Sequence, residues 1–202
     1  MNKNNVFFFV SIFLLMACGS ATPPEQKATL EKYTNHELGW SITIPAGFQS
    51  LSKSRVEANE KKGREAIAAA GTDVQTDSLI HLINFQKNQF NLFSATMEPF
   101  KSQDPSAYEA NNQLIKKLIY DAYAGQKIKV DTSSGKKTVA KHSFSAFYIK
   151  IYGPNGSLLM NQEMYSSLIN GYDFGVSINY NNEYDKKLLL AAFNSSTFVD
   201  HK

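Results

Sequence analysis

The stretch that decides the fold is Asn170-Gly171-Tyr172-Asp173-Phe174-Gly175-Val176-Ser177-Ile178-Asn179-Tyr180. After the first two residues, large apolar side chains alternate with small or polar ones, the period of a strand that buries one face. Asn170-Gly171 suits the two positive-φ positions of a tight hairpin turn. The turn would join this strand to the preceding run, 158–169. The stretch therefore predicts an antiparallel sheet with a covered apolar face.

Three segments rich in helix formers interrupt the strands. The segment 53–70 has few large apolar residues and predicts a surface helix. The next begins at Asp104-Pro105 with a Ser106-x-x-Glu109 capping box and ends at Gly125. A third follows Asn181-Asn182 and runs to about Phe193. The middle helix would bury one stripe (Leu114, Ile115, Leu118, Ile119 and Ala122) and turn Lys116, Lys117 and Asp121 away from it.

The other strand-like runs are short and separated by turn residues. Trp40, Ile42 and Ile44 alternate with polar residues, and 79–85 with 90–97 form a hairpin candidate. Later runs cover 127–131, 138–142 and 144–152, with a turn expected at Ser133-Ser134-Gly135. The whole order predicts an α+β fold, a mainly antiparallel sheet covered by amphipathic helices in an α/β/α sandwich.

The composition excludes some classes of function but does not identify one. The 202 residues are 43% hydrophobic and 19% charged, with a formal net charge of +3. This is the composition of a globular chain, and so small a charge predicts no nucleic-acid partner. Cys18 is the one cysteine in the sequence, which excludes an intramolecular disulfide and a thiolate metal cluster. No cofactor is expected.

The N-terminus has the order of a secretory signal. Lys3 precedes an apolar run from Val6 to Leu15, too short for a membrane span, and Leu15-Met16-Ala17-Cys18 resembles the bacterial lipobox. Two interpretations remain, a free thiol near an ordinary cleavage site and a lipidated anchor, and the second is favoured. It predicts a signal peptide over 1–17, a flexible tether over 18–28 and one domain over 29–202. The protein would be held in the bacterial cell envelope by lipid, with its domain in the periplasm or at the cell surface.

The chain resembles the PsbP-like superfamily in two packing motifs. One is Tyr33 followed by Gly39-Trp40-Ser41-Ile42-Thr43-Ile44-Pro45-Ala46-Gly47-Phe48, and the other is the strand 171–180 with the following helix and Phe198. Residues 50–165 agree in element order only. The lipoprotein signal is similar to that of the DcrB-like branch. The resemblance implies the PsbP-like fold and a non-enzymatic envelope protein, and it supplies no functional residue.

No catalytic or nucleotide-binding motif is present in the sequence. His81 is the most notable of four histidines, because alternation places it on the apolar side of its strand with Ile83 and Phe85. It could be a metal ligand or a general base, but a hydrogen-bonded histidine at the rim of the sheet is favoured. Several tyrosines lie in the late strands: Tyr148, Tyr152, Tyr165 and Tyr180. They could form a surface that binds carbohydrate or peptide, but their period of two favours packing on a sheet face beneath a helix.

Three functions remain open from sequence. The leading hypothesis is a lipid-anchored binding or accessory module for an envelope complex, with an unidentified protein partner. The alternative is a small-ligand binder, recognisable by a concave site between sheet and helix whose polar lining is not needed for packing. The third, a hydrolase, requires a carboxylate or hydroxyl beside His81 or His142.

Overall fold

The computed structural model describes residues 30–69, 78–102 and 104–199. A seven-stranded antiparallel sheet has the order β3-β4-β5-β9-β8-β7-β6. Its strands are β3 (Gln49–Ser50), β4 (Ile80–Gln86), β5 (Leu92–Pro99), β9 (Tyr172–Tyr180), β8 (Leu158–Ile169), β7 (His142–Tyr152) and β6 (Val130–Val139). A smaller sheet orders β1 (Lys32–Asn35), β2 (Trp40–Thr43) and β10 (Thr197–Phe198). The helices are α1 (Lys53–Ala69), α2 (Pro105–Gly125) and α3 (Glu183–Asn194).

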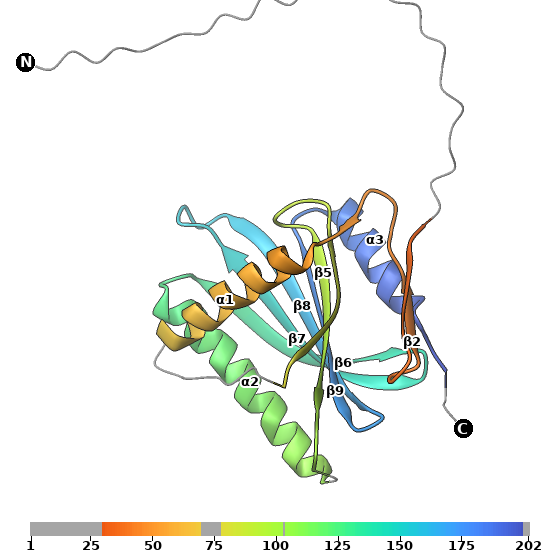
Figure 1. Cartoon of the computed structure of the whole chain (residues 1–202). Helices are drawn as coiled ribbons and strands as arrows, with labels where there is room; N and C mark the ends of the chain where they lie inside the picture. Colours follow the sequence, from red (N-terminus) through yellow and green to blue (C-terminus); the bar gives the residue numbers. More distant parts are fainter. Residues whose placement is uncertain (1–29, 70–77, 103, 200–202) are drawn as a thin grey trace, which may run out of the picture.

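The elements form three layers. Helices α1 and α2 lie on one face of the large sheet, and α3 lies with the small sheet on the other face (Figure 1). The α+β sandwich expected from the sequence is confirmed. The second, three-stranded sheet was not expected, because β10 is only two residues long and pairs with β2 across most of the chain.

The main core lies between the large sheet and the layer of α3 and the small sheet. Phe174, at the middle of the large sheet, has no exposed surface and lies 4.8 Å from the Trp40 ring centroid. Helix α3 adds Leu189 and Phe193, which are equally buried. Burying large aromatic side chains is the main stabilising term for such a domain. The strand that the alternation predicted is therefore the centre of the fold.

The tight turn before β9 has the geometry that the sequence predicted. Asn170 and Gly171 have φ angles of 51° and 83°, and β8 and β9 pair without interruption on either side of them. The Asn170 side chain also donates to the Glu37 carbonyl oxygen at 3.1 Å, which ties the turn to the loop before β2.

The turn expected at Ser133-Ser134-Gly135 is wrong. β6 is one continuous strand from Val130 to Val139, and it pairs with β7 at every residue. The chain reverses instead at Ala140 and Lys141, which have φ angles of 44° and 75°. Serine and glycine suit a turn, but a long ladder to a buried neighbouring strand outweighs that local preference.

Helix α2 begins as expected but with a different cap. Asp104, not Ser106, is the N-cap, and its carboxylate accepts from the Ser106 backbone N–H at 2.8 Å. The Ser106 hydroxyl also donates to this carboxylate at 2.7 Å, and this bond, followed by the backbone one, holds the pKa of Asp104 below its usual value. The expected apolar stripe is only half-covered, since Leu114 is 55% exposed and Ile115 is 38% exposed.

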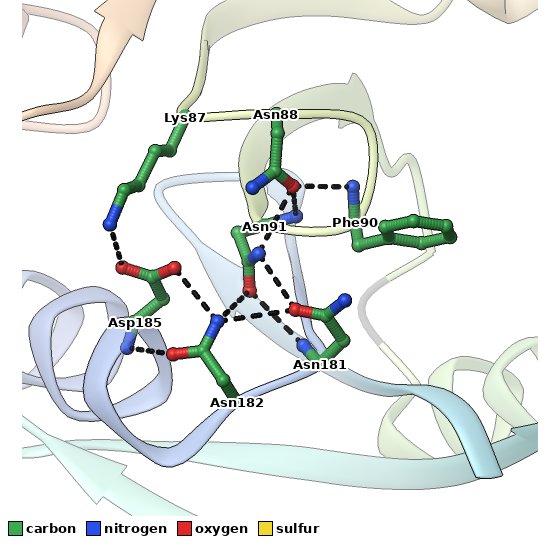
Figure 2. A network of polar contacts seen from close by, with 7 residues as sticks. All are labelled: Lys87, Asn88, Phe90, Asn91, Asn181, Asn182 and Asp185. Carbon is green, nitrogen blue, oxygen red and sulfur yellow. Dashed lines mark hydrogen bonds and ion pairs between the residues drawn. The ribbon is translucent and has the colours of Figure 1, made fainter.

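A network of asparagines joins the β4–β5 loop to the start of α3 (Figure 2). Asn91 has no exposed surface, and both ends of its amide form hydrogen bonds to Asn88, Asn181 and Asn182. Asn182 caps α3 by accepting from the Asp185 N–H at 2.9 Å, which confirms the expected cap. Burial acts to raise the pKa of Asp185, but the hydrogen bonds from Lys87 and Asn182 and the charge of Lys87 lower it overall.

Candidate ligand-binding site

The face of the large sheet toward α1 and α2 is polar at its centre. Because side chains alternate along a strand, the residues between the buried positions of β9 all point to this face. The neighbouring strands β5 and β8 pair with β9 in register and present polar residues beside them. The result is a polar floor made of Ser94, Thr96, Glu98, Ser166, Asp173, Gly175 and Ser177.

Helix α2 is held to the sheet at two places, by Tyr108 over this floor and by apolar contacts beside it. Its Ile119 and Tyr123 pack against an apolar cluster on β7 formed by Phe147, Ile149 and Ile151. Between α2 and the central strands lies a cavity of about 260 Å³. Gly175 leaves space at the middle of the floor because it has no side chain. A Cβ there would lie only 3.2 Å from Thr96 Oγ1.

Asp173 is the central acidic group of the cavity. Its Oδ1 accepts from Tyr108 Oη at 3.0 Å and from Ser166 Oγ at 2.7 Å, and the two hydroxyls also contact each other. Burial raises the pKa of Asp173 above its ordinary value of 3.8, although both hydrogen bonds act in the opposite direction. Burial also raises the pKa of Tyr108, with a further contribution from the charge of Asp173. Tyr108 therefore remains a hydroxyl donor.

A second carboxylate faces Asp173. Glu98 on β5 is paired directly with Asp173 on β9, and its charge adds to the raised pKa of Asp173. Like charges placed opposite each other on neighbouring strands destabilise a sheet. Within residues 30–69, 78–102 and 104–199, neither carboxylate forms an ion pair with lysine, arginine or histidine. Asp173 accepts from the Tyr108 and Ser166 hydroxyls and Glu98 accepts from the Ser78 hydroxyl, but no described cation neutralises the pair.

Asn112 on α2 faces the cavity with an unused hydrogen-bond donor. The residue is only 5% exposed, and its Nδ2 forms no hydrogen bond of normal geometry within the described part of the chain. Burial raises the pKa of Tyr108, and a weak contact from the Asn112 amide acts to lower it. A buried amide without a partner costs about 1–3 kcal/mol, so it is a position where a bound acceptor would be stabilising.

Lys116 lies on the wall of the cavity, which corrects the expectation that it turns away. Its Nζ donates to Ser145 Oγ at 3.4 Å and lies 5.9 Å from the centroid of the Phe147 ring. The helix is rotated relative to the expected stripe because Ile119 and Tyr123, rather than Leu114, contact the apolar cluster on β7.

We expect Asp173→Asn to stabilise the protein by about 1 kcal/mol at neutral pH. The amide oxygen can accept both existing hydrogen bonds, and the substitution removes a buried charge. A carboxyl whose pKa is raised by folding destabilises the folded state above that pKa, and the penalty disappears below the unfolded value of 3.8. Urea denaturation at pH 7 and below pH 3.8 should therefore show a gain at neutral pH that vanishes in acid. A loss of stability at pH 7 would contradict this account.

His81 does not lie where alternation placed it. Leu82 is an extra residue in β4, so His81 pairs with Thr96 while Ile83 already pairs with Ala95. This bulge moves His81 to the helix-covered face, where its Nε2 lies 2.9 Å from Glu60 Oε2 on α1. His81 Nδ1 is buried and has no hydrogen-bond partner among the described residues. The interpretation as a hydrogen-bonded histidine is confirmed, but the predicted face is wrong.

The remaining candidates contribute little to this site. Cys18 and His201 lie outside the described residues, and the His142 ring packs on Phe198 with centroids 4.5 Å apart. Tyr165 and Tyr180 are buried in the main core, as predicted, and both donate to Glu163. In the described ranges, no group of three or more metal-ligating side chains comes together. No described helix is both long and apolar enough to cross a membrane.

The sequence contained a signal for this site that was not interpreted. The alternation of β9 predicts one buried face and leaves open what covers the polar positions from Asp173 to Ser177. They form the floor of the cavity because α2 lies above them. No local sequence pattern marks the other residues of this site: Tyr108, Asn112 and Ser166. They come close to Asp173 only because α2 packs over β8 and β9.

Comparison with known proteins supports the fold. No protein-family model matches the chain, and no curated protein matches it. Among solved structures it is similar to the solution structure of cyanobacterial PsbP (CyanoP) from Synechocystis sp. PCC 6803. The TM-score is 0.55 at 11% sequence identity, over 92% of this chain and 99% of that chain. The expected PsbP-like fold is confirmed, whereas membership of the DcrB-like branch stays a prediction.

Proposed function

We propose that this domain binds a small molecule in the cavity beneath α2, as a non-enzymatic module. One observation carries the proposal: a cavity between sheet and helix whose polar groups are only partly satisfied by the packing. Among the described residues, no cation pairs with Asp173 or Glu98, and Asn112 Nδ2 makes no hydrogen bond of normal geometry. Such groups cost stability, and they are typical of sites that a ligand completes.

The size and lining of the cavity fit a small organic ligand. A space of about 260 Å³ is slightly smaller than the roughly 300–1,000 Å³ that is typical of ligand sites, which suits a ligand of few atoms. Its apolar walls come from Ile115 and Ile119 on α2 and from Phe147 and Met164 on the sheet. A few polar groups at one end would set the orientation of the ligand. This arrangement matches the small-ligand alternative derived from the sequence.

A catalytic role has less support. Glu60 supplies the carboxylate beside His81 that a hydrolase would need. However, no serine, threonine or cysteine is hydrogen-bonded to His81 among the described residues. A general base without a nucleophile or a held water has no defined proton to take. We therefore favour binding over hydrolysis.

Ser94→Leu is expected to abolish the binding of a neutral probe, benzyl alcohol, by filling the floor of the cavity. The full-length chain in detergent micelles, labelled at Ile and Met methyl groups, would be titrated with the probe. Wild-type protein should show shifts at Met164 and Ile119 with a Kd of about 1 mM, and none at Ile42 in the main core. Ser133→Leu, the same change on exposed β6, should behave as wild type. Unchanged Met164 and Ile119 signals in the wild type would overturn the cavity proposal.

We further propose that the module works at a membrane, anchored by lipid on Cys18, and assists an envelope complex. The support is the lipobox-like sequence and the polar segment that follows it. Several acyl chains, at about 0.8 kcal/mol per buried CH₂, would hold the protein on the membrane. A PsbP-like fold gives no partner by itself, because unrelated functions share one fold.

Cys18→Ser is expected to remove fatty-acid labelling completely, and with it the enrichment of any crosslinked envelope partner. Both forms, carrying the same tag, would be crosslinked in cells and their partners identified by mass spectrometry. One dominant partner with the wild-type chain, lost in the variant, supports an accessory role. Equal fatty-acid labelling of the two forms would overturn the proposal of a lipid anchor on Cys18. If the wild-type chain has no partner above background, the proposal of an accessory role is overturned.

A further inference from the structure

We propose that the cavity beneath α2 selects an organic cation, a protonated amine carried on a short apolar body. The inference rests on the proposed binding function and names the chemical class of its ligand. It depends on three features of the cavity: the carboxylate pair at one end, the apolar wall, and the position of Lys116.

The carboxylate pair lacks the counter-charge that its position requires. Asp173 and Glu98 are opposite neighbours on β9 and β5, and both side chains are partly buried. Two carboxylates this close repel each other, and burial strengthens the repulsion. A positive charge between them would offset both costs, and no described residue supplies one. Burial raises the pKa of Asp173, and the charge of Glu98 raises it further.

The hydrogen-bond geometry suits an ammonium group. Asp173 Oδ1 is occupied by Tyr108 and Ser166, which fixes the carboxyl group in place and leaves Oδ2 free of any hydrogen bond to a described residue. The hydroxyls of Ser94 and Thr96 line the same floor and can accept. An ammonium carries three donors and no acceptor, so it matches a floor of carboxylate and hydroxyl oxygens.

The rest of the cavity limits the ligand to one positive charge. Ile115, Ile119 and Met164 offer apolar contact, and Phe147 offers a ring surface. Lys116 already lies over that ring, so a second cationic group would meet a like charge there. The unused Nδ2 of Asn112 adds a donor, which indicates that the natural ligand also carries an oxygen acceptor.

The test compares three probes of nearly the same shape: benzylamine, benzyl alcohol and benzoate. Each is titrated at neutral pH into the full-length chain in micelles, and the Met164 and Ile119 methyl signals are followed. We expect benzylamine to bind at least about 10-fold more tightly than benzyl alcohol, as a charge-assisted hydrogen bond predicts. Benzoate should cause no shift.

Two variants of the cavity and one control identify the source of the preference. Asp173→Asn should remove the preference for benzylamine while changing benzyl alcohol binding less than about twofold. Lys116→Met should strengthen benzylamine binding, because it removes a like charge. Asp131→Asn is the matched control, since Asp131 also accepts from a tyrosine, Tyr152 at 2.5 Å, but lies outside the cavity.

The possible outcomes separate this inference from the function on which it rests. If benzyl alcohol or benzoate binds at least as well as benzylamine, the cation inference is overturned and the binding cavity stands. The same holds if Asp173→Asn leaves the benzylamine preference intact. If no probe shifts a cavity methyl group, both proposals fail together. A benzylamine preference lost in Asp173→Asn and kept in Asp131→Asn supports both.

Discussion

Asn91→Asp is expected to lower the free energy of unfolding by about 3 kcal/mol. Asn91 is fully buried, and its Nδ2 donates to Asn88 Oδ1 at 3.0 Å and to Asn181 Oδ1 at 2.9 Å (Figure 2). Aspartate has the same shape but replaces the donor with an acceptor that faces two acceptors. It also buries a charge that no cation of the described residues contacts, and a buried charge left without a partner is strongly destabilising.

The matched control for this prediction is Asn155→Asp. Asn155 lies in the exposed turn before β8, and its Oδ1 accepts from the Ser157 N–H and hydroxyl. Aspartate keeps both hydrogen bonds there, so the stability should change by less than about 0.5 kcal/mol. Urea denaturation followed by far-UV circular dichroism measures both variants. A loss below about 1 kcal/mol for Asn91→Asp would show that the network does not join the β4–β5 loop to α3 energetically.

Phe174→Ala is expected to cost about 3–5 kcal/mol, the range for a large aromatic removed from a closed core. Phe174 has no exposed surface and contacts Trp40 of the small sheet, Phe144 of β7 and Phe198 of β10. Its loss opens a cavity between the two sheets, which no single neighbour can fill. A domain of ordinary stability would retain little of its folding free energy.

Tyr184→Ala serves as the control for the aromatic truncation. Tyr184 is 68% exposed on α3, so its removal should change stability by less than about 1 kcal/mol. The measurement is again circular dichroism in urea, because Trp40 fluorescence would change with its neighbour Phe174. A Phe174→Ala protein as stable as Tyr184→Ala would mean that the small sheet does not depend on β9 for its packing.

Strong local patterns predicted the elements of this fold correctly. The alternation of β9, the Asn170-Gly171 turn and the Asn182 cap of α3 each depend on neighbouring residues in the chain, and all three are confirmed. The predictions from sequence were wrong where pairing with a distant segment determines the local structure. β6 continues through Ser133–Gly135 because β7 pairs with it, and β10 forms because β2 offers an open edge.

In the candidate site, too, local patterns predicted less than the tertiary contacts determine. One extra residue, Leu82, reversed the face of His81, and no local pattern announces a bulge. Lys116 faces the cavity because the rotation of α2 is set by its contact with β7, not by its own stripe. The polar side of β9 was visible in the sequence, but whether it meets water or a helix depends on where α2 lies.

The sequence by itself determined the sheet-and-helix architecture, the central strand and its turn, because these follow from side-chain period and from backbone preferences at single residues. It also carries the prediction of an anchor at Cys18. Only the tertiary structure decided that Asp173 and Glu98 face each other, that Tyr108 and Asn112 cover them, and that a cavity remains between. Glu98 and Asp173 are 75 positions apart in the chain and meet there. Their placement depends on strand register and helix position, which no single segment of the chain specifies.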